Sequence, residues 1–131
     1  MCWIVSYIGH QDPVPILIKG LRRLEYRGYD SAGLALLDGK NLSSVKKAGK
    51  VSELSDKISS KSIQGTCGIA HTRWATHGVP NDINAHPHLD KTGKIALVHN
   101  GISENYDSIK KTLEGRGIVF KSETDSEVLV Q

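Results

Sequence analysis

Apolar and polar positions along the chain follow two different periods, and the period changes from one segment to the next. Residues 3–8 form a short run rich in β-branched and aromatic side chains, which predicts a buried strand. Between residues 14 and 26 apolar side chains recur every three or four positions, which predicts an amphipathic helix. Pro13 suits the first turn of this helix, and Gly28 suits a position just past its end.

The next segment has the pattern of a β-hairpin followed by a helix. Residues 34–37 are apolar, residues 38–41 are typical of a turn, and residues 42–47 are expected to return antiparallel to the first strand. Apolar residues at positions 51, 54 and 58 then predict a short amphipathic helix.

A long polar connection separates the next two predicted strands. The strands are expected at residues 66–70 and 94–99, and the connection between them, residues 72–93, is rich in histidine and proline. A loop of this length in a compact domain is usually functional or disordered.

The last segment alternates helix, strand and helix. A helix is expected at residues 104–114 with Ser103 as its N-cap, then a short strand at 118–120. A final helix is expected to begin at residue 124 or 125, and the chain stops at its last residue in mid-pattern. We therefore expect a fragment of a longer chain.

Strands in hairpin-like pairs with helices gathered between them predict an α+β fold, a layered arrangement of antiparallel sheets and helices. The glycine-rich loops that cradle nucleotide phosphates do not occur in the sequence. A doubly wound nucleotide-binding fold is therefore disfavoured.

Composition narrows the class of protein further. The 131 residues suit one domain, with 38% apolar and 24% charged residues and a net charge of +3. Basic residues are scattered, which argues against a nucleic-acid partner, and no apolar run has the length of a membrane span. Two cysteines, Cys2 and Cys67, make a poor disulfide framework, so we expect a cytoplasmic protein with Cys67 in its core.

The strongest chemical candidate is Cys2, directly behind the initiator methionine. Removal of Met1 would leave a thiol and a free α-amine on one residue. An α-amine has a pKa of roughly 7.7–8.0, so it can accept a proton near neutral pH. A nucleophile activated by its own terminal amine is one known catalytic arrangement, although an inert cysteine would give the same pattern.

Each of the other candidate site residues has a functional and a structural interpretation. Asn100 and Gly101 follow a predicted strand and could form an oxyanion hole or a plain turn. Arg73 could bind a carboxylate or simply be solvated. His86 and His88 are a weak metal signal, and structural histidines are the expected interpretation.

Asp125 lies in residues 122–125, which have the pattern of ordinary helix capping. Its carboxylate could also bind a substrate ammonium group.

In combination these segments resemble the glutamine amidotransferase domain of the glutamine–fructose-6-phosphate aminotransferase family, which are class II amidotransferases with an N-terminal nucleophile. The longest matching runs are Tyr-Arg-Gly-Tyr-Asp-Ser-Ala-Gly at residues 26–33 and His-Thr-Arg-Trp-Ala-Thr-His-Gly at residues 71–78. The other matching segments are Cys2-x-Ile4-Val5 and residues 22–25, 68–70, 84–88, 98–102 and 122–125.

The resemblance implies an N-terminal nucleophile hydrolase-like fold and hydrolysis of L-glutamine through a thioester on Cys2. Asn100 and the backbone N–H of Gly101 would stabilise the oxyanion. The other implied site residues are Arg73 for the α-carboxylate of glutamine, Asp125 for its α-ammonium, Trp74, Thr76 and His77 in a loop that closes over the substrate, and Arg27 near the nucleophile.

The resemblance also implies that residues 2–131 are a glutamine amidotransferase type 2 domain, incomplete at its C-terminus. The sugar isomerase domains, which would bind fructose 6-phosphate, would be absent. We expect no cofactor, no metal, no membrane contact, and a homo-oligomer for the full-length enzyme. Another class II amidotransferase and a non-catalytic truncated fragment are the alternatives.

Two residues depart from the family pattern. Trp3 and Ser6 stand where the family has glycines, and an indole beside Cys2 can restrict both removal of Met1 and the space for glutamine.

Overall fold

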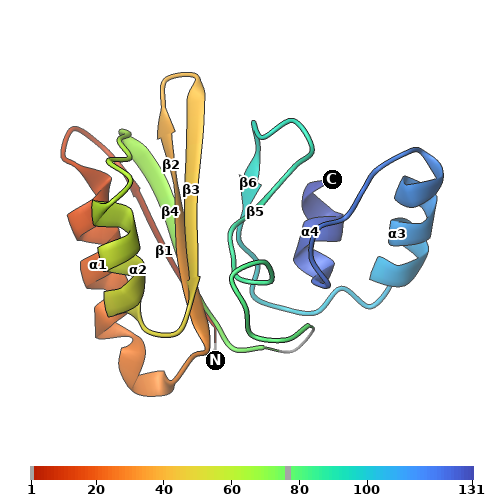
Figure 1. Ribbon diagram of the computed structural model, residues 1–131, viewed down its shortest axis with the longest axis horizontal. Helices are drawn as coiled ribbons and strands as arrows, with labels where there is room; N and C mark the ends of the chain where they lie inside the picture. The colour runs from red at the N-terminus through yellow and green to blue at the C-terminus, as the bar shows by residue number, and fades with distance from the viewer. Residues whose placement is uncertain (1, 76–77) are drawn as a thin grey trace.

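The structure, a computed structural model, describes residues 2–75 and 78–131. The centre of this part is a four-stranded antiparallel sheet with the strand order β1-β4-β2-β3 (Figure 1). Its strands are β1 (Trp3–Ile8), β2 (Ser31–Asp38), β3 (Asn41–Ala48) and β4 (Cys67–Arg73). The predicted hairpin is confirmed, since β2 and β3 pair antiparallel around a turn at residues 38–41.

Two helices cover one face of this sheet, α1 (Pro13–Arg23) and α2 (Val51–Ser59) (Figure 1). Their apolar positions point to the sheet, and Leu17, Leu21 and Leu54 are fully buried there. Burial of such an amphipathic face, rather than helix propensity, supplies most of the stability of short helices.

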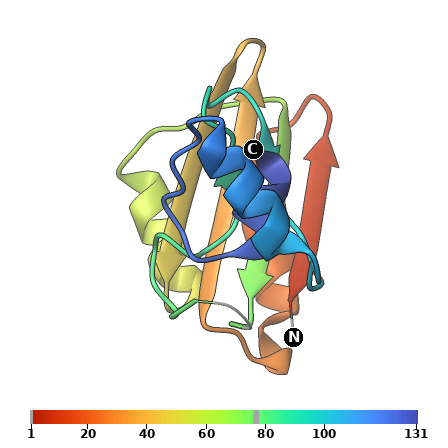
Figure 2. The same cartoon turned by 90° about the vertical axis from the view of Figure 1, so that its right-hand side faces the viewer.

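The opposite face of the sheet carries the C-terminal third of the chain. A two-stranded sheet of β5 (His88–Leu89) and β6 (Ala96–Leu97) lies beside α4 (Asp125–Val130), and α3 (Tyr106–Gly115) is outermost (Figures 1 and 2). The backbone approaches β2 closely, because a Cβ at Gly33 would lie 2.0 Å from the carbonyl oxygen of His86. Only glycine permits this approach.

Antiparallel sheets flanked by helices confirm the predicted α+β class. No helix in the described ranges is both long and apolar enough to cross a membrane.

Several predicted boundaries were wrong in detail. The helix predicted at residues 14–26 ends at Arg23, and a short 3₁₀ helix, η1 (Glu25–Arg27), follows it up to Gly28. The first strand is not buried on both faces. It is an edge strand whose outward residues Ile4 and Ile8 are 43% and 81% exposed.

Cys67 is half-buried rather than a core residue. The helix predicted at residues 104–114 has Asn105, not Ser103, at its N-cap position. Residues 118–120 are not a strand, because no neighbouring strand pairs with them in the described chain. The strand predicted at 94–99 shortens to β6, and its partner β5 lies in what was predicted to be loop.

Candidate active site

A cavity of about 250 Å³ opens where four distant segments meet. Cys2 comes from the start of β1, Arg73 from the end of β4, Gly101 from the loop after β6, and Asp125 from the first turn of α4. The described residues that line it are Cys2, Arg73, Trp74, His86, His99, Gly101, Ile102, Thr124, Asp125 and Ser126. The cavity therefore brings together most of the predicted site residues.

Two contacts position Cys2. Its Sγ accepts a hydrogen bond from the backbone N–H of Trp74 at 3.1 Å, and its carbonyl oxygen accepts one from Nδ2 of Asn100 at 2.9 Å. The first contact follows from the antiparallel pairing of β1 with β4, in which Trp3 lies opposite Thr72. The strand thus holds the thiol at the cavity wall.

The indole of Trp3 does not line this cavity within the described structure. It packs instead against Arg27, whose guanidinium carbon lies 5.5 Å from the centre of the indole ring and 5.3 Å from the ring of Tyr26. Arg27 therefore lies beside Trp3, the residue that follows Cys2. The expected restriction of the pocket by Trp3 does not occur.

Asn100 contacts the backbone of Cys2, and Gly101 lines the same cavity as Cys2. Oδ1 of Asn100 is 2.7 Å from Nε2 of His71. Gly101 has a φ of 155°, and a Cβ there would lie 2.9 Å from Nε2 of His99. The position therefore requires glycine, which leaves its backbone unobstructed beside the cavity.

Arg73 and Asp125 have opposite charges and line the same cavity, and they are only 3% and 4% exposed. The Arg73 guanidinium donates hydrogen bonds to the carbonyl oxygens of Gly78 at 3.2 Å and Val79 at 3.4 Å. Oδ2 of Asp125 accepts the backbone N–H of Ser103 at 2.8 Å. Buried charges held in this way are preorganised for a ligand that carries both signs.

The segment after Arg73 was predicted to close over the substrate. Trp74 lines the cavity but is 53% exposed, and the backbone N–H of Ala75 donates to a carboxylate oxygen of Asp30. Thr76 and His77 lie outside the described residues. Residues 84–88 of the long connection are buried.

Three buried histidines form a cluster beside this cavity, and the sequence pattern did not predict that their rings would meet. The rings of His71 and His86 stack with centres 4.3 Å apart, and His88 meets His86 edge-on at 4.7 Å. Nε2 of His86 is 2.8 Å from the hydroxyl oxygen of Ser126, and Nε2 of His88 is 2.9 Å from that of Thr124. His86 and His88 thus have hydroxyl partners, in line with the structural interpretation.

Burial is the main cause that lowers the pKa of each of these rings. It lowers the pKa of His71 to about 4, against the opposing effect of its contact with Asn100. It lowers the pKa of His88 to about 3 and also depresses that of His86, where the neighbouring rings of His71 and His88 add to the effect. All three are therefore neutral at pH 7.

Other lining residues could have been found from their sequence neighbours. His99 precedes Asn100, and Thr124 and Ser126 flank Asp125. The contact between His71 and Asn100 has no such signal, because the two residues are 29 positions apart along the chain.

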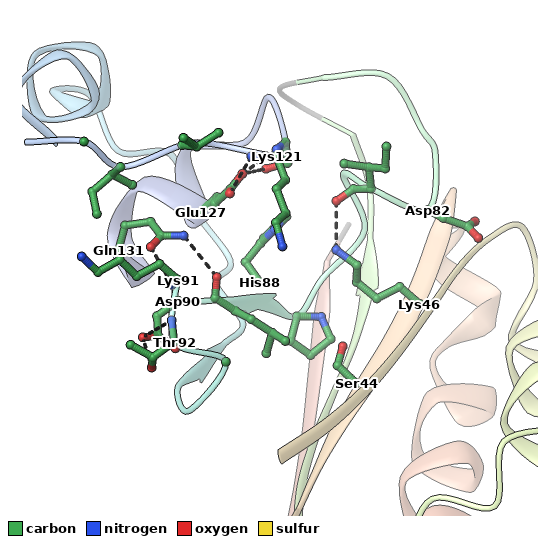
Figure 3. Close-up of a pocket in the computed structure, with 18 of the residues that line it drawn as sticks. Ser44, Lys46, Asp82, His88, Asp90, Lys91, Thr92, Lys121, Glu127 and Gln131 are labelled. Carbon is green, nitrogen blue, oxygen red and sulfur yellow. Dashed lines mark hydrogen bonds between the residues drawn. The ribbon is translucent and has the colours of Figure 1, made fainter. Parts of the chain in front are cut away.

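A larger cavity of about 1050 Å³ lies between β3 and the β5–β6 pair (Figure 3). Lys46 and His88 face it, and the Lys46 ammonium donates to the carbonyl oxygen of Ile83 at 2.9 Å. Burial lowers the pKa of Lys46 to about 8. None of the predicted site residues that the structure describes lines this larger cavity, so the smaller cavity remains the candidate active site.

The antiparallel sheet and its helices, with Cys2 and Gly101 at one cavity, have the fold of an N-terminal nucleophile hydrolase-like protein. Two solved structures share the fold, and each match covers 98% of this chain. The glutamine phosphoribosylpyrophosphate amidotransferase of B. subtilis, complexed with ADP and GMP, has a TM-score of 0.81 at 30% identity. A structure of the allosteric regulatory enzyme of purine biosynthesis has a TM-score of 0.83 at 31% identity. This chain covers 28% of each of those chains.

Residues 53–131 match the family described as the glutamine amidotransferase domain, and the chain belongs to this family. Among curated proteins it is 61% identical to the glutamine–fructose-6-phosphate aminotransferase [isomerizing] of Bacteroides thetaiotaomicron, over 100% of this chain and 22% of that protein. It is 56% identical to the protein of the same name from Thermus thermophilus, over 98% of this chain and 21% of that protein. The chain thus spans about a fifth of the length of the curated relatives it matches.

Proposed function

We propose that this chain is the glutamine-hydrolysing part of an enzyme that transfers the amide nitrogen of glutamine to fructose 6-phosphate. The observation that carries the proposal is the cavity shared by Cys2, Arg73, Gly101 and Asp125. Its volume of about 250 Å³ is below the roughly 300–1,000 Å³ of pockets for drug-sized ligands. A small substrate such as an amino acid suits that volume.

Glutamine recognition is assigned to the two buried charges. Arg73 would bind the α-carboxylate, because a guanidinium matches a carboxylate in shape and charge. Asp125 would bind the α-ammonium, and its bond from the Ser103 N–H leaves further lone pairs for the substrate. Trp74, Thr76 and His77 would close over the bound amino acid.

Cys2 is the proposed nucleophile once Met1 has been removed. Its α-amine would take the thiol proton as sulfur attacks the side-chain carbonyl carbon of glutamine. The oxyanion would accept hydrogen bonds from Asn100 and the backbone N–H of Gly101. Collapse would expel ammonia, with the proton returned to the leaving nitrogen, and water would then cleave the thioester to give glutamate and the free thiol. Arg27 would support the nucleophile from beside Trp3.

The nature of the acceptor rests on the relatives. Their names state fructose 6-phosphate, and the identities of 53–61% span nearly the whole of this chain. Residues 2–131 would then be part of one glutamine amidotransferase domain, with the acceptor bound by a separate part of the full-length protein. The free thiols of Cys2 and Cys67 suit a reducing compartment such as the cytoplasm.

The mechanism is tested in the protein expressed at its full encoded length. Wild-type protein should release glutamate from glutamine, and Cys2→Ala should abolish this release. Cys67→Ala is the matched control, because it removes the other thiol, which does not line the cavity. Retained glutaminase activity in Cys2→Ala would refute the mechanism. Mass spectrometry of the active protein should show an N-terminus that starts at Cys2.

The acceptor is tested separately by adding fructose 6-phosphate. Formation of glucosamine 6-phosphate that depends on glutamine supports the proposed reaction. Glutamine hydrolysis without sugar amination, together with amination of a different acceptor, would favour another class II amidotransferase. One solved relative is by its title a glutamine phosphoribosylpyrophosphate amidotransferase, which makes that the second candidate.

A further inference from the structure

The side-chain amide of Asn100 is held at both ends. Nδ2 lies 2.9 Å from the carbonyl oxygen of Cys2, and Oδ1 lies 2.7 Å from Nε2 of His71. Asn100 itself is at the surface, so these two contacts, rather than burial, orient its amide.

The carbonyl of Cys2 decides which end of the amide faces which partner. A carbonyl oxygen can only accept, so the amide nitrogen of Asn100 must face Cys2 and the amide oxygen must face His71. His71 must then donate, and Nε2 must carry the proton of the neutral ring. Nδ1 of His71 is consequently unprotonated, and it has no hydrogen-bond partner within the described part of the chain.

His71 is well placed to hold the amide. It lies in β4 two residues before Arg73, so the two side chains lie on the same face of the strand. It is fully buried, its ring stacks on His86, and His86 in turn contacts Ser126 on α4. Burial keeps the ring neutral at pH 7 by lowering its pKa to about 4.

We infer that His71 is a positioning residue of the glutaminase reaction: its Nε2–H holds Asn100 so that one Nδ2 proton binds the Cys2 carbonyl and the other remains for the oxyanion. The inference rests on the proposed function. His71 does not line the cavity and touches no substrate in this scheme, so it acts only through Asn100.

The first test replaces His71 in the full-length protein. His71→Phe keeps a ring but loses the donor, and kcat for glutamine should fall about 10- to 100-fold, as for a misplaced catalytic group. KM should stay within about threefold, because Arg73 and Asp125 are unchanged. Alkylation of Cys2 by iodoacetamide forms no oxyanion, so its rate should not change. A fall in alkylation as large as the fall in kcat would overturn the inference.

The matched pair His71→Gln and His71→Asn serves if the phenylalanine variant does not fold. The glutamine amide nitrogen reaches the place of Nε2, whereas that of asparagine reaches only the place of Nδ1. His71→Gln should therefore retain about tenfold more kcat than His71→Asn. Equal activities in the two variants would contradict a donor role at Nε2.

A double-mutant cycle separates positioning from general structural support. In an Asn100→Ala background, His71→Phe or His71→Asn should lower kcat by less than about threefold, because the amide on which His71 acts is gone. The same loss in both backgrounds would refute the inference.

A spectroscopic test distinguishes failure of this inference from failure of the proposed function. In ¹⁵N-histidine-labelled protein, His71 should show a proton on Nε2 and none on Nδ1 at neutral pH, and its Nε2–H signal should shift in Asn100→Ala. A proton on Nδ1 would overturn the assignment even if glutamine is hydrolysed. If wild-type protein releases no glutamate, the proposed function fails, and this spectrum still decides whether His71 orients Asn100.

Discussion

Replacing Asp125 by asparagine removes one negative charge from the cavity but keeps an oxygen that can accept the Ser103 N–H at the same place. Asp125 is only 4% exposed, so water screens its charge weakly. If it binds the α-ammonium of glutamine, the variant exchanges a charge-assisted hydrogen bond for a neutral one. Such bonds contribute about 1.5–3 and about 0.5–1.5 kcal/mol respectively.

The expected loss is therefore about 1–2 kcal/mol, which corresponds to a fall in kcat/KM of about 5- to 30-fold. Most of this change should be in KM, because the ammonium is remote from the bond that breaks. The matched control is Asp107→Asn, the same change in the first turn of an exposed helix, and it should leave kcat/KM unaltered.

Inhibition by glutamate and glutarate isolates the ammonium contact, since the two molecules differ only by the α-amino group. Wild-type protein should bind glutamate more tightly than glutarate, and Asp125→Asn should reduce this preference by about the same 5- to 30-fold. A variant that weakens both inhibitors equally would refute the assigned contact. Thermal unfolding should confirm that the variant is folded, because the bond to Ser103 is kept.

Three further predictions follow from the packing. Gly101→Ala should lower kcat for glutamine by about 10²-fold or more, because its Cβ would lie 2.9 Å from Nε2 of His99 and would displace the proposed oxyanion donor. Steady-state kinetics tests this prediction. Gly33→Ala should reduce the free energy of unfolding in urea by about 1–3 kcal/mol through its 2.0 Å approach to the His86 carbonyl, whereas Gly115→Ala, with open space around its Cβ, should not destabilise the protein. The pKa values of His71, His86 and His88 are lowered in the folded protein, so below roughly pH 6.5 the unfolded chain binds protons on these rings and the folded chain does not. The free energy of unfolding should therefore fall as the pH drops from about 6.5 towards about 4. Each histidine contributes up to about 1.4 kcal/mol per pH unit to this fall. Urea titrations across this range should show a shallower dependence in His88→Gln, and an unchanged slope would contradict the prediction.

Local patterns predicted the regular elements of the first half of the chain well. The hairpin of β2 and β3 and the helix α2 follow from period-2 and period-3.6 spacing together with turn residues, all of which act between near neighbours. The same reasoning failed at residues 118–120, where β-branched residues suggested a strand. A strand also needs a partner, and no neighbouring strand in the described chain supplies one.

For the site residues too, the sequence predicted the identities but not the arrangement in space. Cys2, Arg73, Asn100, Gly101 and Asp125 were predicted from their chemistry together with the family resemblance, and the structure gathers them within one cavity or in contact with it. Their catalytic and binding roles stay predictions. No local pattern indicated that they would converge, because they are separated by up to 123 positions along the chain, from residue 2 to residue 125.

The amino-acid sequence by itself determined the thiol at position 2, the amphipathic helices and the hairpin, because each depends on one residue or on side chains a few positions apart. Only the tertiary structure decided that β1 is an edge strand and that His71 meets Asn100. It also decided that the charges of Arg73 and Asp125 are buried around one cavity. The physical reason is that hydrogen bonds and burial between distant segments depend on how the sheets and helices pack, and nearest-neighbour preferences contain no information about that packing.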